Sequence, residues 1–428
     1  MKTRYFLAIC LIMMFLFNIA EVGNAANEAT DSSEKTVVSA STKFGIKLFK
    51  QLFSSELPGQ KKKPVNILIS PVGISMALSM AYNGSDGDTK KAMEQTLELE
   101  GLRLNEINTS NKELLNQYVN NISTGQISIA NSLWVAKDRE LKETFVSQTT
   151  DYYFAEIENI DLNSPKTVKT INSWVSDKTG GKIQDIVDSI SEDTLMLIIN
   201  AVYFKSNWAK EFNKNATEKR TFYMLQGEKK HQMMWQSGTY RYFRTNQFQT
   251  IALPYKGLEY SVPRQSINNT KRLCLYIFLP EKNYGIKQFC DNLSYDNLCQ
   301  WMIQYRQLGY NEGQITLPKF TFSFKKELKT YLSEMGMAEA FNPLKANFNK
   351  MAGSQAWIDR VIHQTFIEVN ESGTEAAAAT RANILEGIVI TEISKEPFNM
   401  VVDRPFFFVI HDDSTEAILF MGTVMEPQ

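Results

Sequence analysis

The residues that could support hydrolytic or metal chemistry in this chain do not stand in the arrangements that such chemistry requires. The 428-residue sequence contains three histidines, His231, His363 and His411. None of them lies in a His-Glu-x-x-His zinc motif, and the sequence has neither a Gly-x-Ser-x-Gly nucleophile turn nor a phosphate-binding Walker loop. No recognisable motif therefore supplies a nucleophile with a base beside it. We expect no enzyme activity, no metal site and no cofactor.

The most distinctive segment is Glu371-Ser-Gly-Thr-Glu-Ala-Ala-Ala-Ala-Thr380. Its alanines (Ala376, Ala377, Ala378 and Ala379) follow Gly373 and Glu375 in a polar setting that is typical of an exposed loop. From Thr374, however, alternate positions are small or apolar, in the series Thr374, Ala376, Ala378, Thr380, Ala382 and Ile384. This two-residue period is typical of a strand with one buried face. We therefore expect the segment to occupy a loop and a sheet at different times. A partly helical resting state is the alternative, because alanine favours helices.

The elements that must position this segment can be predicted from composition and periodicity. The chain is 43% hydrophobic with net charge −1, and no Pro/Gly/Ser-rich linker divides it, so we expect one large domain. Periodicity predicts helices over Val38–Phe53, Ile74–Tyr82 and Thr89–Leu97. It predicts strands over Asn66–Pro71, Gln126–Ala136, Thr194–Phe204 and Ile315–Phe324, and a hairpin of Pro405–Ile410 with Ala417–Val424. Helices early and strands late favour an α+β fold. The near-zero net charge argues against a nucleic-acid partner.

The N-terminus has the order of a secretory signal peptide. Lys2 and Arg4 precede the apolar run Tyr5–Ala20, and small residues follow at Gly23-Asn-Ala25. The run is short for a membrane-spanning helix, which needs about 20 residues. We expect residues 1–25 to be removed, residues 26–37 to be a flexible segment, and residues 38–428 to form the domain. An uncleaved anchor is the alternative. The mature protein is then expected to be secreted, with no membrane attachment.

Cysteines and glycosylation acceptors add little constraint. Three cysteines remain after the signal, Cys274, Cys290 and Cys299, and they form no closely spaced framework. Buried thiols are favoured over a Cys290–Cys299 bridge. Asn-x-Ser/Thr glycosylation acceptors occur at Asn83, Asn108, Asn121, Asn215, Asn268, Asn292 and Asn370. They matter only if a eukaryotic cell produces the chain as a glycoprotein.

The segment at Glu371–Thr380 strongly resembles the hinge of the reactive-centre loop of serpins, a family of protease inhibitors. Further motifs resemble serpin signatures and occur in the family's order along nearly the whole mature chain. They are Asn66-Ile-Leu-Ile-Ser-Pro-Val72, Asn172-Ser-Trp-Val175 with Thr179, Asn200-Ala-Val-Tyr-Phe-Lys205 with Trp208, Leu317-Pro-Lys-Phe320, Asp403-Arg-Pro-Phe406 and Phe420-Met-Gly422. Each motif is weak evidence alone, but the set at compatible spacings is highly specific.

The resemblance implies a serpin fold, with about nine helices around three β-sheets and a reactive-centre loop over about 371–397. It implies a suicide-type inhibitor of serine proteases, in which the cleaved loop inserts into the central sheet and traps the acyl-enzyme. Insertion would start at Thr374, beside the flexible Gly373. No inward position from Thr374 to Ala382 is charged or bulky, which favours the inhibitory type over a non-inhibitory carrier, chaperone or storage serpin.

The family's spacing from Glu371 places the scissile bond at Gly387–Ile388, and a shift of one position gives Glu386–Gly387 or Ile388–Val389. The aliphatic surroundings favour an elastase- or subtilisin-like target. The segment before Pro405 is longer than usual, however, and counting back from it places the cut near Lys395, which would suit a trypsin-like protease. Inhibition of cysteine proteases is a further alternative.

The resemblance also assigns a polar gate in the central sheet. Ser70, Asn200 and His363 resemble the family's shutter residues, and Trp208 resembles the breach tryptophan at the top of the sheet. Gly73 stands where serpins often have serine. The region Leu97–Asn121, where some relatives carry a basic helix, has only Arg103 and Lys112 as basic residues, so heparin is not expected as a partner. We expect a monomer whose partner is its target protease.

Overall fold

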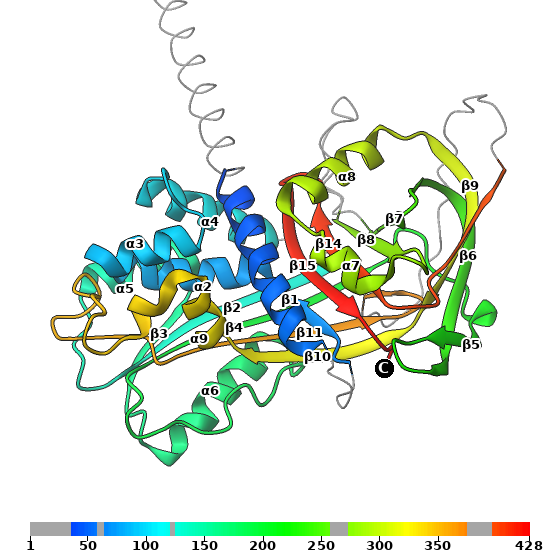
Figure 1. Cartoon of the computed structure of the whole chain (residues 1–428). Helices are drawn as coiled ribbons and strands as arrows, with labels where there is room; N and C mark the ends of the chain where they lie inside the picture. The colour runs from blue at the N-terminus through cyan, green and yellow to red at the C-terminus, as the bar shows by residue number, and fades with distance from the viewer. Residues whose placement is uncertain (1–35, 58–63, 120–124, 257–272, 375–395) are drawn as a thin grey trace, which may run out of the picture.

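The computed structural model describes residues 36–57, 64–119, 125–256, 273–374 and 396–428. Within them lie two β-sheets, one of six strands and one of nine, with helices packed around them (Figure 1). None of the helices in these ranges is long and apolar enough to cross a membrane.

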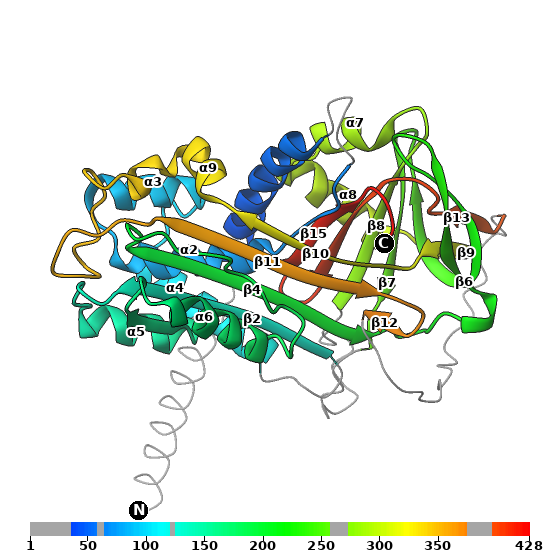
Figure 2. The ribbon, with the colours of Figure 1, turned by 90° about the horizontal axis from the view of Figure 1, so that it is seen from below.

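The six-stranded sheet carries the candidate site. Its order is β10 (Phe320–Glu327), β11 (Arg360–Val369), β12 (Gly373–Thr374), β4 (Met196–Asn207), β2 (Gly125–Ala136) and β3 (Glu156–Ile160). Helix α6 (Pro165–Lys178) covers one face, while α2 (Pro71–Gly84), α3 (Gly87–Thr96), α4 (Leu104–Val119) and α5 (Glu143–Tyr153) lie on the other (Figure 2). The central strand β4 is therefore buried between helices on both faces, as its mostly apolar sequence predicts.

The nine-stranded sheet has the order β1 (Ile67–Ile69), β15 (Ala417–Val424), β14 (Phe406–Asp412), β8 (Leu273–Pro280), β7 (Phe248–Pro254), β6 (Glu228–Arg244), β9 (Tyr310–Pro318) and β13 (Phe398–Val401), with β5 (Glu218–Tyr223) beside β6. The long strand β6 pairs first with β5, then with β9 and finally with β7. Because β6 is shared in this way, the second and third of the three expected sheets are one hydrogen-bonded network in the described part of the chain. The α-helices that follow β8 in the described chain are α7 (Gly285–Asp291), α8 (Tyr295–Gln307) and the short α9 (Lys329–Leu332).

Most of the predicted elements are confirmed. Residues 36–56 are helical, β1 is a buried strand, and α2 is buried along its whole length. Ser70 caps α2 by accepting a hydrogen bond from the Gly73 amide at 3.1 Å, and Pro71 occupies the first turn. The hairpin of β14 and β15 is antiparallel, as expected.

One predicted strand is wrong. Ile315–Phe324 is not a single strand, because β9 ends at Pro318 and β10 begins at Phe320 in the other sheet. Pro318 has no amide hydrogen with which to continue the ladder, and Lys319 turns to donate its own amide to Gln232 in β6. The three-residue step from Leu317 to Phe320 shifts the phase of the apolar alternation at this change of sheet, so the sequence does mark the break that the single-strand prediction overlooked.

The structure also shows the surroundings of the three cysteines and of two buried glycosylation acceptors, Asn83 and Asn108. Cys274, Cys290 and Cys299 form no disulfide; the first two are buried, as expected, whereas Cys299 is only partly buried. Burial raises the pKa of the Cys290 thiol, so this group stays protonated. Asn83 and Asn108 are buried and hydrogen-bonded to each other at 2.8 and 3.0 Å, so neither is accessible to glycosylation in the folded protein.

Candidate functional site

The hinge segment already occupies the end of the six-stranded sheet. β11 ends at Val369, the chain reverses through residues 370–372, and β12 returns antiparallel between β11 and β4. Asn370 stabilises this turn, because its side-chain oxygen accepts the amides of Ser372 at 3.0 Å and Gly373 at 3.3 Å. The segment Glu371–Thr374 is thus buried structure rather than the start of an exposed loop.

Thr374 is the innermost residue of the seated hinge. Its side chain is completely buried, and its hydroxyl lies 2.8 Å from the hydroxyl of Tyr255. Tyr255 stacks on Trp208 with ring centroids 4.5 Å apart. Burial raises the pKa of Tyr255 far above its ordinary value, so its hydroxyl remains a proton donor. Thr374 therefore enters the sheet with its polar atom satisfied.

Gly373 is required by this packing. Its φ of 155° is rarely adopted by other residues, and a Cβ placed there would lie 2.2 Å from the Ser206 carbonyl oxygen in β4. Gly373→Ala is therefore expected to displace β12 from the sheet, measured as faster hydrogen exchange in the peptide covering 370–374. Gly353→Ala is the control, because nothing lies within 4 Å of a Cβ there. Unchanged exchange in Gly373→Ala would contradict the seated hinge.

Glu371 connects the turn to two residues that lie next to strands β5 and β9. Its carboxylate forms an ion pair with Lys319 at 2.9 Å and accepts a hydrogen bond from the Thr217 hydroxyl at 2.8 Å. Burial alone would raise the pKa of Glu371, but the Lys319 contact and the hydrogen bonds outweigh it and lower that pKa. The carboxylate is thus charged at neutral pH and holds the turn in place.

Trp208 lies directly beneath the same turn. Its backbone amide donates to the Ser372 carbonyl at 3.0 Å, and its indole N–H donates to the Asn370 carbonyl at 2.9 Å. Its ring packs between Tyr255 and Phe212 and is almost fully buried. The tryptophan that the sequence pointed to is therefore a direct contact of the hinge.

Ser70, Asn200 and His363 lie together in the middle of the sheet. The Ser70 amide donates to His363 Nε2 at 3.2 Å, so the ring proton sits on Nδ1, which donates to Asn200 Oδ1 at 2.7 Å. Asn200 in turn donates to Asn131 Oδ1 at 2.6 Å. This chain of hydrogen bonds joins the start of α2 to β11, β4 and β2. The His363–Asn200 bond crosses the boundary between the parallel strands β11 and β4.

His363 is neutral, because complete burial lowers its pKa to about 3. Its pKa in the unfolded chain is about 6.5, so protonation favours unfolding. Stability from this group is present above about pH 6.5 and is expected to fall towards pH 3, at up to about 1.4 kcal/mol per pH unit.

The measurement is the urea midpoint as a function of pH for wild type and His363→Gln, whose difference isolates this group. His231→Gln is the control, because His231 is only partly buried. Parallel pH profiles for wild type and His363→Gln would contradict the neutral, buried state of His363.

Asn131 and Tyr255 belong to this site but were not predicted from the sequence. Asn131 is a buried polar residue inside an apolar strand, a signal that could have found it. Tyr255 has no such signal, because only the fold brings it to Thr374. At Gly73, a Cβ would lie 2.8 Å from Val202 and 3.0 Å from the Asn200 amide, so there is no room for serine here unless those side chains move. The other hinge and scissile-bond residues lie outside the described residues: Glu375, Ala376, Ala377, Ala378, Ala379, Thr380, Glu386, Gly387, Ile388, Val389 and Lys395.

Comparisons with known proteins identify the family to which this fold belongs. A family model described as Serpin (serine protease inhibitor) matches residues 39–427. The chain belongs to the serpin family. The fold expected from the resemblance is thereby confirmed, and so is the expectation that the chain is not an enzyme, since serpins are protease inhibitors.

Curated serpins cover almost the whole chain. An "Uncharacterized serpin-like protein" of Methanosarcina acetivorans is 32% identical over 96% of this chain and 92% of its own length. The "Leukocyte elastase inhibitor" of Xenopus laevis is 32% identical over 91% of this chain and 99% of its own length. "Serpin B6" of Macaca fascicularis is also 32% identical, over 86% of this chain and 95% of its own length.

Solved serpin structures have the same fold. The thermophilic serpin tengpin in its native state superimposes with a TM-score of 0.76 at 27% identity, covering 91% of this chain and 94% of tengpin. Human thyroxine-binding globulin complexed with thyroxine gives a TM-score of 0.79 at 24% identity, covering 92% of this chain and all of that chain, a likeness of fold alone.

Proposed function

We propose that this serpin is a secreted, suicide-type inhibitor of serine proteases that traps the acyl-enzyme by inserting its cleaved loop between β11 and β4. The observation that carries the proposal is the seated hinge. β11 and β4 pair directly and in parallel from Arg360 with Leu197 to Phe366 with Tyr203, whereas β12 lies antiparallel between them beyond that point.

Continued insertion from Thr374 would therefore separate β11 from β4 progressively, one residue pair at a time. Each added residue would replace part of one parallel ladder with two antiparallel ladders, which are somewhat more stable per residue. The neutral His363–Asn200 bond would have to open on the way. Opening a polar contact whose partners can find new ones is easier than separating a packed apolar core, so the two residues would serve as the gate.

The target is proposed to be elastase- or subtilisin-like. The aliphatic residues around Gly387–Ile388 support this, as does the likeness to a leukocyte elastase inhibitor. A cut near Lys395 would instead favour a trypsin-like protease. Secretion is proposed from the N-terminal sequence alone.

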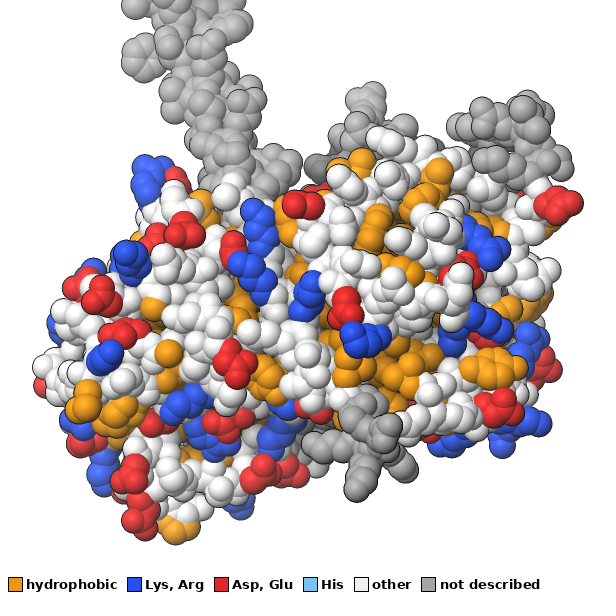
Figure 3. Space-filling view, viewed as in Figure 1, with side chains coloured by type: hydrophobic (Ala, Val, Ile, Leu, Met, Phe, Trp, Pro, Cys, Tyr) orange, Lys and Arg blue, Asp and Glu red, His pale blue; other side chains and the backbone are white. Residues whose placement is uncertain are grey.

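A polyanion such as heparin is not proposed as a partner. Arg103, at the start of α4, is paired with Glu106, and Lys112 lies over the Tyr152 ring. Basic and acidic side chains alternate over the face of the molecule in Figure 3, with no extended basic patch on that face.

The proposal is tested by incubating the purified protein with elastase, subtilisin, trypsin and a Glu-specific protease. We expect an SDS-stable complex with elastase or subtilisin, and the mass of the released C-terminal fragment identifies the scissile bond. Complexes with trypsin alone would support the cut near Lys395. Cleavage without a complex by every protease would contradict inhibition and favour a non-inhibitory serpin, while a complex with a cysteine protease such as papain would extend the class.

A further inference from the structure

A pocket lies beside the hinge, between the strands β6, β7 and β8 and the end of α8. It has a volume of about 190 Å³ and is bounded on one side by Trp208. Cavities of about 150 Å³ in proteins hold a benzene ring, whereas typical drug-sized sites exceed about 300 Å³. The pocket can therefore hold one substituted aromatic ring, but not a large ligand.

Two buried polar atoms in the pocket lack partners among the described residues. They are Gln236 Oε1 and the Tyr240 hydroxyl, and their residues are only 6% and 8% exposed. Burial raises the pKa of Tyr240 to about 12, so its hydroxyl is protonated at neutral pH. An unpaired buried acceptor is unfavourable, and a ligand that donates to it would remove this cost.

The remaining walls are aromatic and already satisfied. Tyr276 donates its hydroxyl to Asp413 at 2.9 Å, and Tyr305 donates to the Arg241 carbonyl at 3.1 Å while accepting the Ala252 amide at 2.8 Å. These two tyrosines therefore offer ring surface rather than free hydroxyls to a ligand. Ring surface favours stacking with another aromatic ring.

The charges around the pocket favour an anion. Lys210 and Arg241 line its mouth, and Lys210 uses only one of its three protons in donating to the Ser237 carbonyl at 2.6 Å. A Cβ built at Gly238 would lie 3.0 Å from both the Lys210 ammonium and the Tyr240 hydroxyl, so these two groups lie close to each other beside the glycine backbone.

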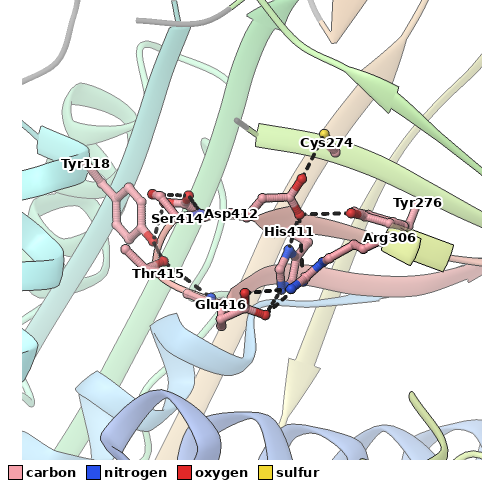
Figure 4. Close-up of polar contacts among 11 residues, drawn as sticks. Tyr118, Cys274, Tyr276, Arg306, His411, Asp412, Ser414, Thr415 and Glu416 are labelled. Atoms are coloured by element: carbon pink, nitrogen blue, oxygen red, sulfur yellow. Dashed lines mark hydrogen bonds and ion pairs between the residues drawn. The ribbon is translucent and has the colours of Figure 1, made fainter. Parts of the chain in front are cut away.

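The one carboxylate in the lining, Asp413, is already occupied. Its Oδ1 atom is contacted by Tyr276 at 2.9 Å and His411 at 2.8 Å, and its Oδ2 atom by the Cys274 thiol at 3.6 Å. Figure 4 shows the labelled side chains of Tyr276, His411 and Cys274 gathered on one side of the hairpin end. These contacts outweigh the effect of burial and lower the pKa of Asp413. The Arg306 guanidinium also lies 4.0 Å from the Asp413 carboxylate and partly neutralises its negative charge. Asp413 therefore offers little attraction to a cationic ligand.

We propose that this pocket binds a small aromatic carboxylate. Its ring would lie among Trp208, Tyr276 and Tyr305, and its carboxylate would face Lys210 and Tyr240. An O–H or N–H group on the ring would donate to Gln236 Oε1. The site goes beyond protease inhibition, although it shares Trp208 with the hinge and so lies one side chain from the turn at residues 370–372.

Binding is tested by calorimetry on the full chain with three probes that share one ring: 4-hydroxyphenylacetate, the neutral 4-methylphenol and the cationic tyramine. We expect saturable 1:1 binding, tightest for the carboxylate. Gln236→Leu and Tyr240→Phe are each expected to weaken 4-hydroxyphenylacetate by roughly fivefold or more, because each removes one buried hydrogen bond. Lys210→Met should weaken the carboxylate but leave 4-methylphenol within about twofold. Lys214→Met is the control, because Lys214 is exposed and does not line the pocket.

Three outcomes would overturn the proposal. Absence of saturable binding by all three probes at millimolar concentration would mean that the pocket holds water only. Tighter binding of tyramine would refute the charge assignment. Unchanged affinity in both Gln236→Leu and Tyr240→Phe would place the ligand elsewhere. None of these measurements uses a protease, so their failure is distinct from failure of the proposed inhibition.

Discussion

Replacing Thr374 with arginine is expected to convert the protein from an inhibitor into a substrate of its target protease. Thr374 is fully buried between β11 and β4, and its only polar side-chain atom is satisfied by Tyr255. A guanidinium at this position would have to be buried without a counter-ion, a cost large enough to stall insertion. The acyl-enzyme would then hydrolyse before the protease is trapped.

The measurement is the ratio of SDS-stable complex to cleaved serpin with the protease that forms a complex with wild type. Thr374→Val is the matched control, because it keeps the size of the side chain and loses only the contact with Tyr255. We expect Thr374→Val to form the complex and Thr374→Arg to be cleaved with almost none. Equal complex formation by the arginine variant would refute insertion from Thr374.

The alternation that identified Thr374 is a local property of the chain, and for that reason the sequence could predict it. The start of a helix directly after a buried strand is an equally local pattern. Strand β1, for example, is followed by the N-cap residue Ser70 and by Pro71 in the first turn of α2. Such patterns depend only on which residues follow one another. They are sufficient to predict most helices and strands of the described chain.

The partners of these residues could not be predicted in the same way. Tyr255 meets Thr374 because β7 leads into the region under the hinge, and Asn131 meets Asn200 because β2 pairs with β4 in one particular register. Both contacts depend on sheet order, which no period along the chain encodes. The seating of Gly373 is similar: its glycine is visible in the sequence, but the Ser206 carbonyl that forbids a side chain comes from β4.

The break between β9 and β10 shows what the periodicity of apolar residues cannot predict, namely the sheet to which a strand belongs. Apolar residues alternate within each half, at Ile315 and Leu317 and then at Phe320, Phe322 and Phe324, and the two halves belong to different sheets. Alternation reports that one face of each strand is buried, not against which layer it is buried. Two local signals mark the change: Pro318, and the three-residue step from Leu317 to Phe320 that shifts the phase of the alternation.

Cleavage of the loop is expected to raise the melting temperature of the protein by about 10 °C or more. Insertion of about fourteen residues, at about 0.5–1.5 kcal/mol per net hydrogen bond, would stabilise the sheet by on the order of ten kcal/mol. The gain would come from the boundary between β11 and β4, where an inserted strand pairs on both sides instead of leaving one parallel ladder.

The measurement compares intact and loop-cleaved protein by thermal unfolding, with cleaved Thr374→Arg as the control. Both cleaved proteins have lost the same covalent bond, but only the wild type is expected to insert its loop, so only its melting temperature should rise. A rise in both would separate stabilisation from the burial of Thr374 and contradict the role given to this residue. Equal melting temperatures for intact and cleaved wild type would mean that the cleaved loop stays outside the sheet, and the carrier or storage alternative would then replace inhibition.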